Sequence, residues 1–353
     1  MRVIRMKEKL QVFIENAGWP RIIIGLFLVS LFIAAPFVGV RLDASLSDTL
    51  VRVGMNGILV LAMVPMVQSG CGLNFGLPLG IIAGLLGAVT SIQIGVTGTL
   101  GFIAALVMAV PLAVVFGWMY GQLLNRVKGD EMMIATYVGF SSVALMCMAW
   151  LLLPFTSPTM IWGYGGSGLR TTISVEGFWL NALSKHLHIK IGEFFYLPIG
   201  MYIFFALMVF LVWGFFRTKT GTAVTAVGSN PEFARASGID VDKMRTISVI
   251  LSTVLGAIGI LVYEQSFGFI QLYMGPFYMA FPAVAAILLG GASVNKASMV
   301  NVLVGTFLFQ GILTMTPSVI NSVMQTDMSE VIRIIVSNGM ILYALTRKVM
   351  VKR

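Results

Sequence analysis

The sequence predicts an all-α protein that crosses a membrane as a helical bundle of about ten helices. Hydrophobic residues make up 58% of the 353-residue chain and charged residues only 10%, which is far from the composition of a soluble domain. The apolar residues gather in runs close to the roughly 20 residues that a helix needs to span a bilayer. Most of the Lys and Arg residues flank alternate connections between these runs, as in the cytoplasmic loops of membrane proteins.

The apolar runs give the predicted helices in chain order. They cover residues 21–40, 53–69, 76–94, 99–124, 132–153, 196–216, 246–263, 277–291, 298–315 and 331–346. The stretch FALMVFLVWGFF in the sixth run is apolar on every side, which favours a helix over an alternating barrel strand. Each run is therefore interpreted as one crossing.

The distribution of positive charge predicts the orientation. With the N-terminus inside, cytoplasmic segments hold most of the 23 Lys and Arg residues, and an even number of crossings returns the C-terminus to the cytoplasm. The formal charge of +9 then reflects cytoplasmic flanks and gives no reason to expect nucleic acid as a partner. The first residues, MRVIRMKEKL, do not resemble a cleaved signal peptide. We expect a multi-pass protein of the plasma or inner membrane with the lipid bilayer as its surroundings.

Two long connections interrupt a single transmembrane domain over residues 21–353, which follows a cytoplasmic segment at 1–20. Residues 154–195 form an external loop that either caps the outer mouth, touches a delivering partner, or is a solvated connection without a role. Residues 217–245 form a cytoplasmic loop that contains GSNPEFARASGIDVDKMR. This second loop carries the most specific local pattern in the chain.

The cytoplasmic loop predicts a short helix followed by a sharp turn. Asn230 is a good N-cap, Pro231 suits the first helical position, and Glu232 lies near the positive end of the helix dipole. Gly238 can take the left-handed conformation that ends a helix. A second helix, capped by Asp240 or Asp242, should then enter the membrane.

This arrangement is more elaborate than a connection between two membrane helices requires. We therefore expect a cytoplasmic partner to dock on it. The alternative is a helix that lies on anionic lipid headgroups, held by Arg217, Lys219, Arg235, Lys243 and Arg245.

Residues 217–263 resemble the coupling-loop region of ABC importer permeases in the ribose, simple-sugar, nucleoside and branched-chain amino acid group. The matching positions are Arg217, Thr218, Gly221, Ala226, Gly228, Asn230, Ala234, Ala236, Ser237, Gly238, Ile239, Gly256 and Gly259. A second similar pattern follows at Ala286, Gly290, Gly291, Gly305 and Thr306. The two patterns occur in the family's order and spacing.

The resemblance implies the transmembrane subunit of an ATP-driven importer, with a separate cytoplasmic ATPase docked on the loop. It also implies a second permease subunit, identical or not, that forms the translocation path together with this one, and an extracytoplasmic binding protein that delivers the substrate. The residues that it assigns to ATPase coupling are Asn230, Pro231, Glu232, Ala234, Arg235, Ser237 and Gly238. On this interpretation Ala234→Arg or Gly238→Pro should uncouple uptake without preventing insertion.

The segment SGCGLNFGLPLG at 69–80 departs from the family. Sugar permeases carry an acid and a Ser here, and this chain has neither; nucleoside permeases carry a Glu where Pro78 stands. Pro78 and its neighbouring glycines predict a broken helix that lines a cavity. Gly72, Gly76, Gly80 and Gly84 recur every four residues, which predicts one helix face that packs closely on a neighbour.

Uncharged polar side chains within the predicted helices indicate the substrate path. An amide in hydrocarbon is costly unless it finds water or a partner, so these side chains either line a path or bond between helices. An aromatic ring beside them could stack on a cyclic solute or serve packing alone. The candidates are Asn56, Gln68, Asn74, Phe75 and Gln93. A simple sugar or nucleoside-like solute suits such a weakly polar lining.

The rival hypothesis is an ion-coupled secondary transporter or channel for a small polar solute. Such a protein needs an ionisable group near the membrane centre, and Glu264, Arg52 and Arg333 fall at predicted helix ends. No nucleophile with a base and no metal-ligand cluster has convincing spacing. We therefore expect no catalytic residues, no metal and no cofactor, and a transport permease rather than an enzyme.

Overall fold

The computed structural model describes residues 19–162, 168–185 and 187–324, together with 331, 334–336, 338 and 339. Within this part of the chain, eight helices are long and apolar enough to cross a membrane. A shorter apolar helix, Gly275–Leu289, corresponds to the eighth predicted segment. The predicted segment 331–346 and the predicted cytoplasmic segment 1–20 lie largely outside the described residues.

Helices account for most of the described chain. In order they are α2 Trp19–Ala34, the 3-10 helix η1 Ala35–Val38, α3 Leu42–Leu61, α4 Met63–Gln68, α5 Leu77–Ile94, α6 Gly98–Arg126, α7 Glu131–Leu152, α8 Ile199–Arg217, α9 Lys219–Ser229, α10 Pro231–Ala236, α11 Val241–Phe267, α12 Gly275–Leu289 and α13 Met299–Met324. The predicted all-α membrane bundle is confirmed.

Four short strands occur in the connections at one end of the bundle. β1, Thr172–Ser174, pairs antiparallel with β4, Phe269–Gln271, so the 154–195 connection is tied to the chain that follows α11. β2, Ile189–Ile191, and β3, Phe195–Leu197, form an antiparallel hairpin. Trp179 from the same connection is fully buried. Within the described residues, this connection therefore packs on the bundle through Trp179 and the β1–β4 pair, whereas residues 187–194 are exposed.

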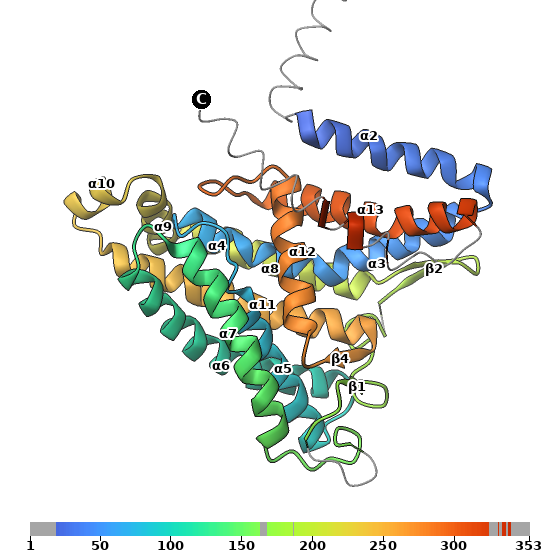
Figure 1. Ribbon diagram of the computed structural model, residues 1–353, viewed down its shortest axis with the longest axis horizontal. Coiled ribbons are helices and arrows are strands. Elements are labelled where there is room, and N and C mark those ends of the chain that lie inside the picture. The colour runs from blue at the N-terminus through green and yellow to red at the C-terminus, as the bar shows by residue number, and fades with distance from the viewer. Residues whose placement is uncertain are drawn as a thin grey trace, which may run out of the picture.

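The two ends of the molecule differ in structure. Figure 1 shows α9 and α10 at one end, and the strands β1 and β4 towards the opposite end. α2 runs along α13, where a Leu28 side chain packs on Gly311. The predicted orientation, with residues 217–245 on one side and 154–195 on the other, requires this separation.

Close backbone contact holds α5 against α11. A Cβ atom added to Gly80 would lie 2.5 Å from the Thr253 carbonyl oxygen, and one added to Gly84 would lie 2.7 Å from that of Ala257. The predicted close packing is thus present for these two glycines. Gly72 and Gly76 precede α5, and Gly72 has φ +79°, so the prediction that all four glycines share one helix face is wrong. The turn at 69–76 interrupts the helix before Pro78, which lies in the first turn of α5.

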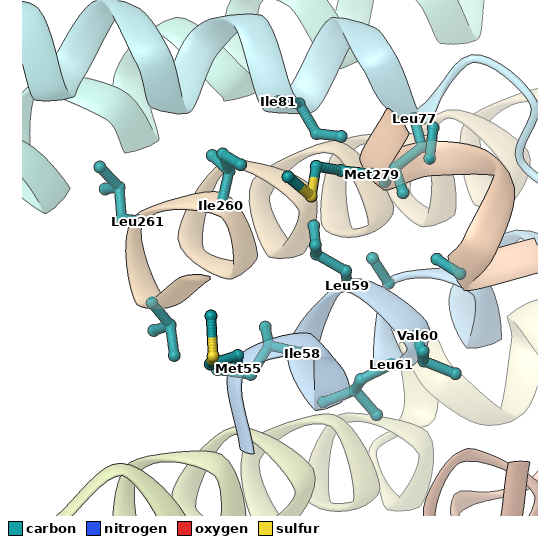
Figure 2. Packing of buried hydrophobic residues seen from close by; sticks show 14 of the residues in the cluster. Met55, Ile58, Leu59, Val60, Leu61, Leu77, Ile81, Ile260, Leu261 and Met279 are labelled. Carbon is teal, nitrogen blue, oxygen red and sulfur yellow. The ribbon is translucent and has the colours of Figure 1, made fainter. Parts of the chain in front are cut away.

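The interior between α3, α5, α11 and α12 is filled with apolar side chains. Figure 2 shows Met55 and Leu59 of α3, Leu77 of α5, Ile260 of α11 and Met279 of α12 in this shared core. Leu59 and Leu77 are fully buried, and Met279 is 9% exposed. The centre of this single chain is therefore a packed apolar core.

Candidate functional site

Residues 217–245, which the sequence predicts to be cytoplasmic, fold into the predicted elbow, which we define as α9, α10 and the first turn of α11. The Asn230 side chain accepts a hydrogen bond from the Phe233 amide at 2.9 Å, and Pro231 occupies the first turn of α10. Gly238 has φ +82°, and the Ile239 amide donates to the Ala234 carbonyl at 3.0 Å. These bonds form a left-handed helix end of the Schellman type.

Asp240 begins the helix that enters the membrane. Its carboxylate accepts a hydrogen bond from the Lys243 amide at 3.0 Å, so Asp240 rather than Asp242 is the N-cap of α11. Asp242 instead pairs with Lys128 of the α6–α7 turn at 2.8 Å. The base of the elbow is thereby joined to the neighbouring helix pair.

A second ion pair lies deeper at the same junction. The Arg245 guanidinium lies 3.0 Å from the Glu131 carboxylate, and the two side chains are only 11% and 13% exposed. Asn125 adds hydrogen bonds to the Asp242 carbonyl and the Thr246 hydroxyl at 2.8 and 2.9 Å. Arg245 is thus committed to a protein contact, whereas the other four basic residues of the predicted lipid-binding group, Arg217, Lys219, Arg235 and Lys243, are exposed.

The elbow has its own small core. Val227 of α9, Ala234 of α10 and Val241 of α11 are buried together, and Ile239 and Met244 pack against them. Ala234 is fully buried, so its small size serves the packing of the elbow. The other predicted coupling residues, which include Glu232, Arg235 and Ser237, are exposed.

Phe233 is a feature that sequence reasoning missed. Its side chain is 68% exposed on α10, directly before the buried Ala234. An exposed large aromatic side chain on a short polar helix is a typical anchor for a partner pocket. The signal was present in the sequence as the one aromatic residue of PEFARA.

The turn at 69–76 brings Asn74 into a buried polar group. The Asn74 side-chain amide donates to the Ser252 hydroxyl at 2.8 Å, and its carbonyl accepts from the Tyr120 hydroxyl at 3.2 Å. Ser252 in turn donates to the Ala62 carbonyl, where α3 meets α4. Asn74 is fully buried and joins the 69–76 turn to α6 and α11.

The other predicted path residues lie at separate levels of the bundle. The Gln68 side chain donates to the Ala297 carbonyl between α12 and α13, and Asn56 donates to the Arg52 carbonyl one turn earlier in α3 at 2.9 Å. Gln93 accepts from the Thr156 and Ser157 amides at 3.1 and 3.0 Å, at the opposite end of α5. The structure therefore does not bring the four amides together in one cluster.

Phe75 extends from the same turn towards α12. Its ring centroid lies 6.1 Å from that of Phe281, and Phe281 lies at the same distance from Phe140 of α7. A pocket of ≈ 420 Å³ occurs near the other end, lined by residues that include Thr97, Thr99 and Lys185. The five predicted path residues do not line this pocket.

Glu264 has surroundings that the sequence did not reveal. It lies one turn before the end of α11, is 1% exposed, and neither carboxylate oxygen has a hydrogen-bond partner among the described residues. A buried carboxyl without a partner is energetically costly. It is therefore the most unusual ionisable group of the described bundle.

The second family-like pattern forms a close helix contact. A Cβ atom added to Gly305 of α13 would overlap the Ala286 carbonyl of α12, and one added to Gly290 would lie 2.9 Å from the Gly305 nitrogen. The Asn301 side chain donates to the Gly290 carbonyl at 2.7 Å. These residues hold α12 and α13 together beside the turn that connects them.

A match to a protein-family model identifies the family of this chain. The model for branched-chain amino acid transport system permease components matches residues 45–344. The chain belongs to this permease family. Membership confirms the resemblance inferred from the two patterns, and it identifies a multi-pass membrane transport component rather than an enzyme.

Characterised relatives align over part of their length. The permease is 25% identical over 249 residues to the autoinducer 2 import system permease protein LsrC of Enterobacter sp. (strain 638), covering 69% of this chain and 67% of that protein. It is 24% identical over 240 residues to the nucleoside ABC transporter permease protein NupB of Lactococcus lactis subsp. cremoris (strain MG1363), covering 64% and 61%. The permease thus spans about two thirds or less of these relatives. No solved structure matches it.

Proposed function

We propose that this permease is the transmembrane subunit of an ATP-driven importer and that the elbow receives a separate ATP-binding-cassette ATPase. The observation that carries the proposal is the exposed Phe233 on a capped, internally packed elbow at one end of the bundle. Family membership and the relatives' names supply the transport class. A second permease subunit and an extracytoplasmic binding protein complete the proposed assembly.

The elbow suits the transfer of force from a partner. Its caps and its core of Val227, Ala234 and Val241 fix the direction of α10, while Phe233 projects away from that core. A rigid helix transmits a displacement that a flexible loop would absorb. The proposed coupling residues are therefore Phe233 together with the exposed Asn230, Pro231, Glu232, Arg235, Ser237 and Gly238, with Ala234 as their internal support.

We propose a simple sugar or nucleoside-like molecule as the solute. The named relatives concern autoinducer 2 and nucleosides, and both names support a small polar cargo. Asn74 and Ser252 bond to each other between helices, so the proposed solute class rests on the family and on the relatives' names.

Co-purification from the native membrane tests the proposal. A cytoplasmic ATPase should be recovered with the permease in fixed proportion, and Phe233→Ala should reduce its recovery by about tenfold or more, as expected for loss of an aromatic anchor. Phe37→Ala is the matched control, because Phe37 is 85% exposed on a different part of the molecule. Equal recovery with both variants would refute docking through Phe233.

The ion-coupled transporter remains a second candidate because of Glu264. Its buried, unpartnered carboxyl is the kind of group that ion-coupled carriers use. Uptake into vesicles that contain the permease without an ATPase, driven by an ion gradient alone, would support this candidate. Uptake that requires both ATP and the co-purified ATPase would support the importer.

A further inference from the structure

Two glycines place the elbow directly against the turn at 69–76. A Cβ atom added to Gly228, in the last turn of α9, would overlap the Gln68 carbonyl and would lie 3.0 Å from the Gly70 nitrogen. A Cβ atom added to Gly70 would lie 3.1 Å from the Gly228 Cα atom. Gly70 also has φ +77°, a conformation that disfavours other residues. The two backbones therefore touch without an intervening side chain.

The elbow side of this contact belongs to one packed unit. Val227, the neighbour of Gly228, lies in the core with Ala234 of α10 and Val241 of α11. A displacement of α10 must therefore move the end of α9 or break that core. Gly228 is the point at which this unit meets the turn at 69–76.

The turn at 69–76 in turn holds three parts of the bundle. Asn74 bonds to Ser252 of α11 and Tyr120 of α6, and a Cβ atom added to Gly139 of α7 would lie 2.6 Å from the Phe75 carbonyl oxygen. Immediately before the turn, the Gln68 side chain bonds to the Ala297 carbonyl beside α13. A shift of this turn would therefore act directly on its contacts with α6, α7 and α11.

We propose that the contact between Gly70 and Gly228 transmits movement of the elbow to the 69–76 turn and, through it, to α6 and α11. This inference rests on the proposed docking of an ATPase at the elbow. Two glycines suit the role because direct backbone contact leaves no flexible side chain to take up the displacement. Gly70 and Gly228 are thus positioning residues, and neither is required to touch the solute.

Cys71 provides a native reporter within the turn. It is 2% exposed and packs with Met66 and Tyr120, so its alkylation by N-ethylmaleimide requires the turn to move. In the purified complex of permease and ATPase, addition of ATP and vanadate, which traps ADP and vanadate in the ATPase, should change the Cys71 alkylation rate by about tenfold, a factor within the range of typical coupling energies. Cys147 of α7 serves as the internal control.

Gly228→Ala should remove the nucleotide response of Cys71 while the ATPase still co-purifies. Gly214→Ala is the matched control, because a Cβ atom there has nothing within 4 Å. Where Gly228→Ala does not fold, Val227→Ala loosens the elbow core without adding an atom to the contact, and it should weaken the same response. If Gly228 served packing alone, Gly228→Ala would alter the alkylation rate of Cys71 in the absence of nucleotide. The change in that rate on addition of nucleotide would then be intact.

The outcomes separate this inference from the proposed function. Absence of an ATPase from the wild-type preparation would contradict the docking proposal itself. An ATPase that co-purifies but leaves Cys71 alkylation independent of nucleotide would overturn only the transmission proposal. A full nucleotide response in folded Gly228→Ala would overturn it as well.

Discussion

Adjacent residues on α10 have opposite environments. Phe233 is 68% exposed, whereas Ala234 is fully buried between α9 and α11. The family-like pattern marks Ala234, yet the structure gives that residue a packing role and leaves the partner surface to its neighbour. A substitution at Ala234 therefore tests the integrity of the elbow before it tests docking.

Ala234→Arg should unfold the elbow locally, because a buried unpaired charge is strongly destabilising. Amide hydrogen exchange over residues 219–245 should rise by about tenfold or more, with the membrane helices unaffected. Ala236→Arg is the matched control, since Ala236 is exposed on the same helix. Slow exchange throughout the elbow in Ala234→Arg would contradict the packing assigned to it.

Glu264→Gln should preserve or raise stability. The amide has the shape of the carboxyl group and removes an ionisable group that has no described partner. We expect a gain of about 1 kcal/mol in the unfolding free energy, measured by thermal unfolding in detergent. A loss of stability would show that Glu264 makes an ionic contact, and abolished uptake at normal stability would favour ion coupling.

Helix packing depends on glycine where α5 meets α11. Gly84 approaches Ile260 and the Ala257 backbone so closely that a methyl group has no space. This contact fixes the distance between the two helices that flank the apolar interior. In a membrane, such backbone proximity replaces part of the hydrophobic driving force that soluble helices use.

Gly84→Ala should lower the unfolding free energy by about 1 to 3 kcal/mol through overpacking. Gly214→Ala adds the same methyl group in open space on α8 and should leave the melting temperature unchanged or slightly higher. The two variants can be compared by thermal unfolding in one detergent. Equal melting temperatures of Gly84→Ala and Gly214→Ala would mean that α5 and α11 can move apart to admit the methyl group at no cost in free energy.

The whole molecule has one end formed by the elbow and another formed by the strand-containing connection. The predicted orientation places these ends on opposite sides of the membrane. A cysteine introduced at exposed Glu176 should therefore react with a membrane-impermeant maleimide in intact cells. A cysteine at exposed Arg235 should react only after permeabilisation, and the reverse pattern would invert the orientation.

Hydropathy predicted the crossings well because each helix must be apolar over the bilayer thickness. It placed the start of the second segment at residue 53, whereas α3 begins at Leu42, since its polar first turns continue the helix beyond the apolar run. The elbow was predictable from local capping chemistry at Asn230 and Gly238. The contact of Gly70 with Gly228, and the burial of Glu264, depend on residues far apart in the chain and leave no local pattern.

The apolar side chains of Met55, Leu59, Leu77 and Met279 have an electrical consequence for the cell. An ion that entered this interior would lose its hydration shell without gaining replacement ligands. The core of a single permease subunit is thus electrically insulating. In the proposed importer, the solute would then cross between the two permease subunits rather than through this core.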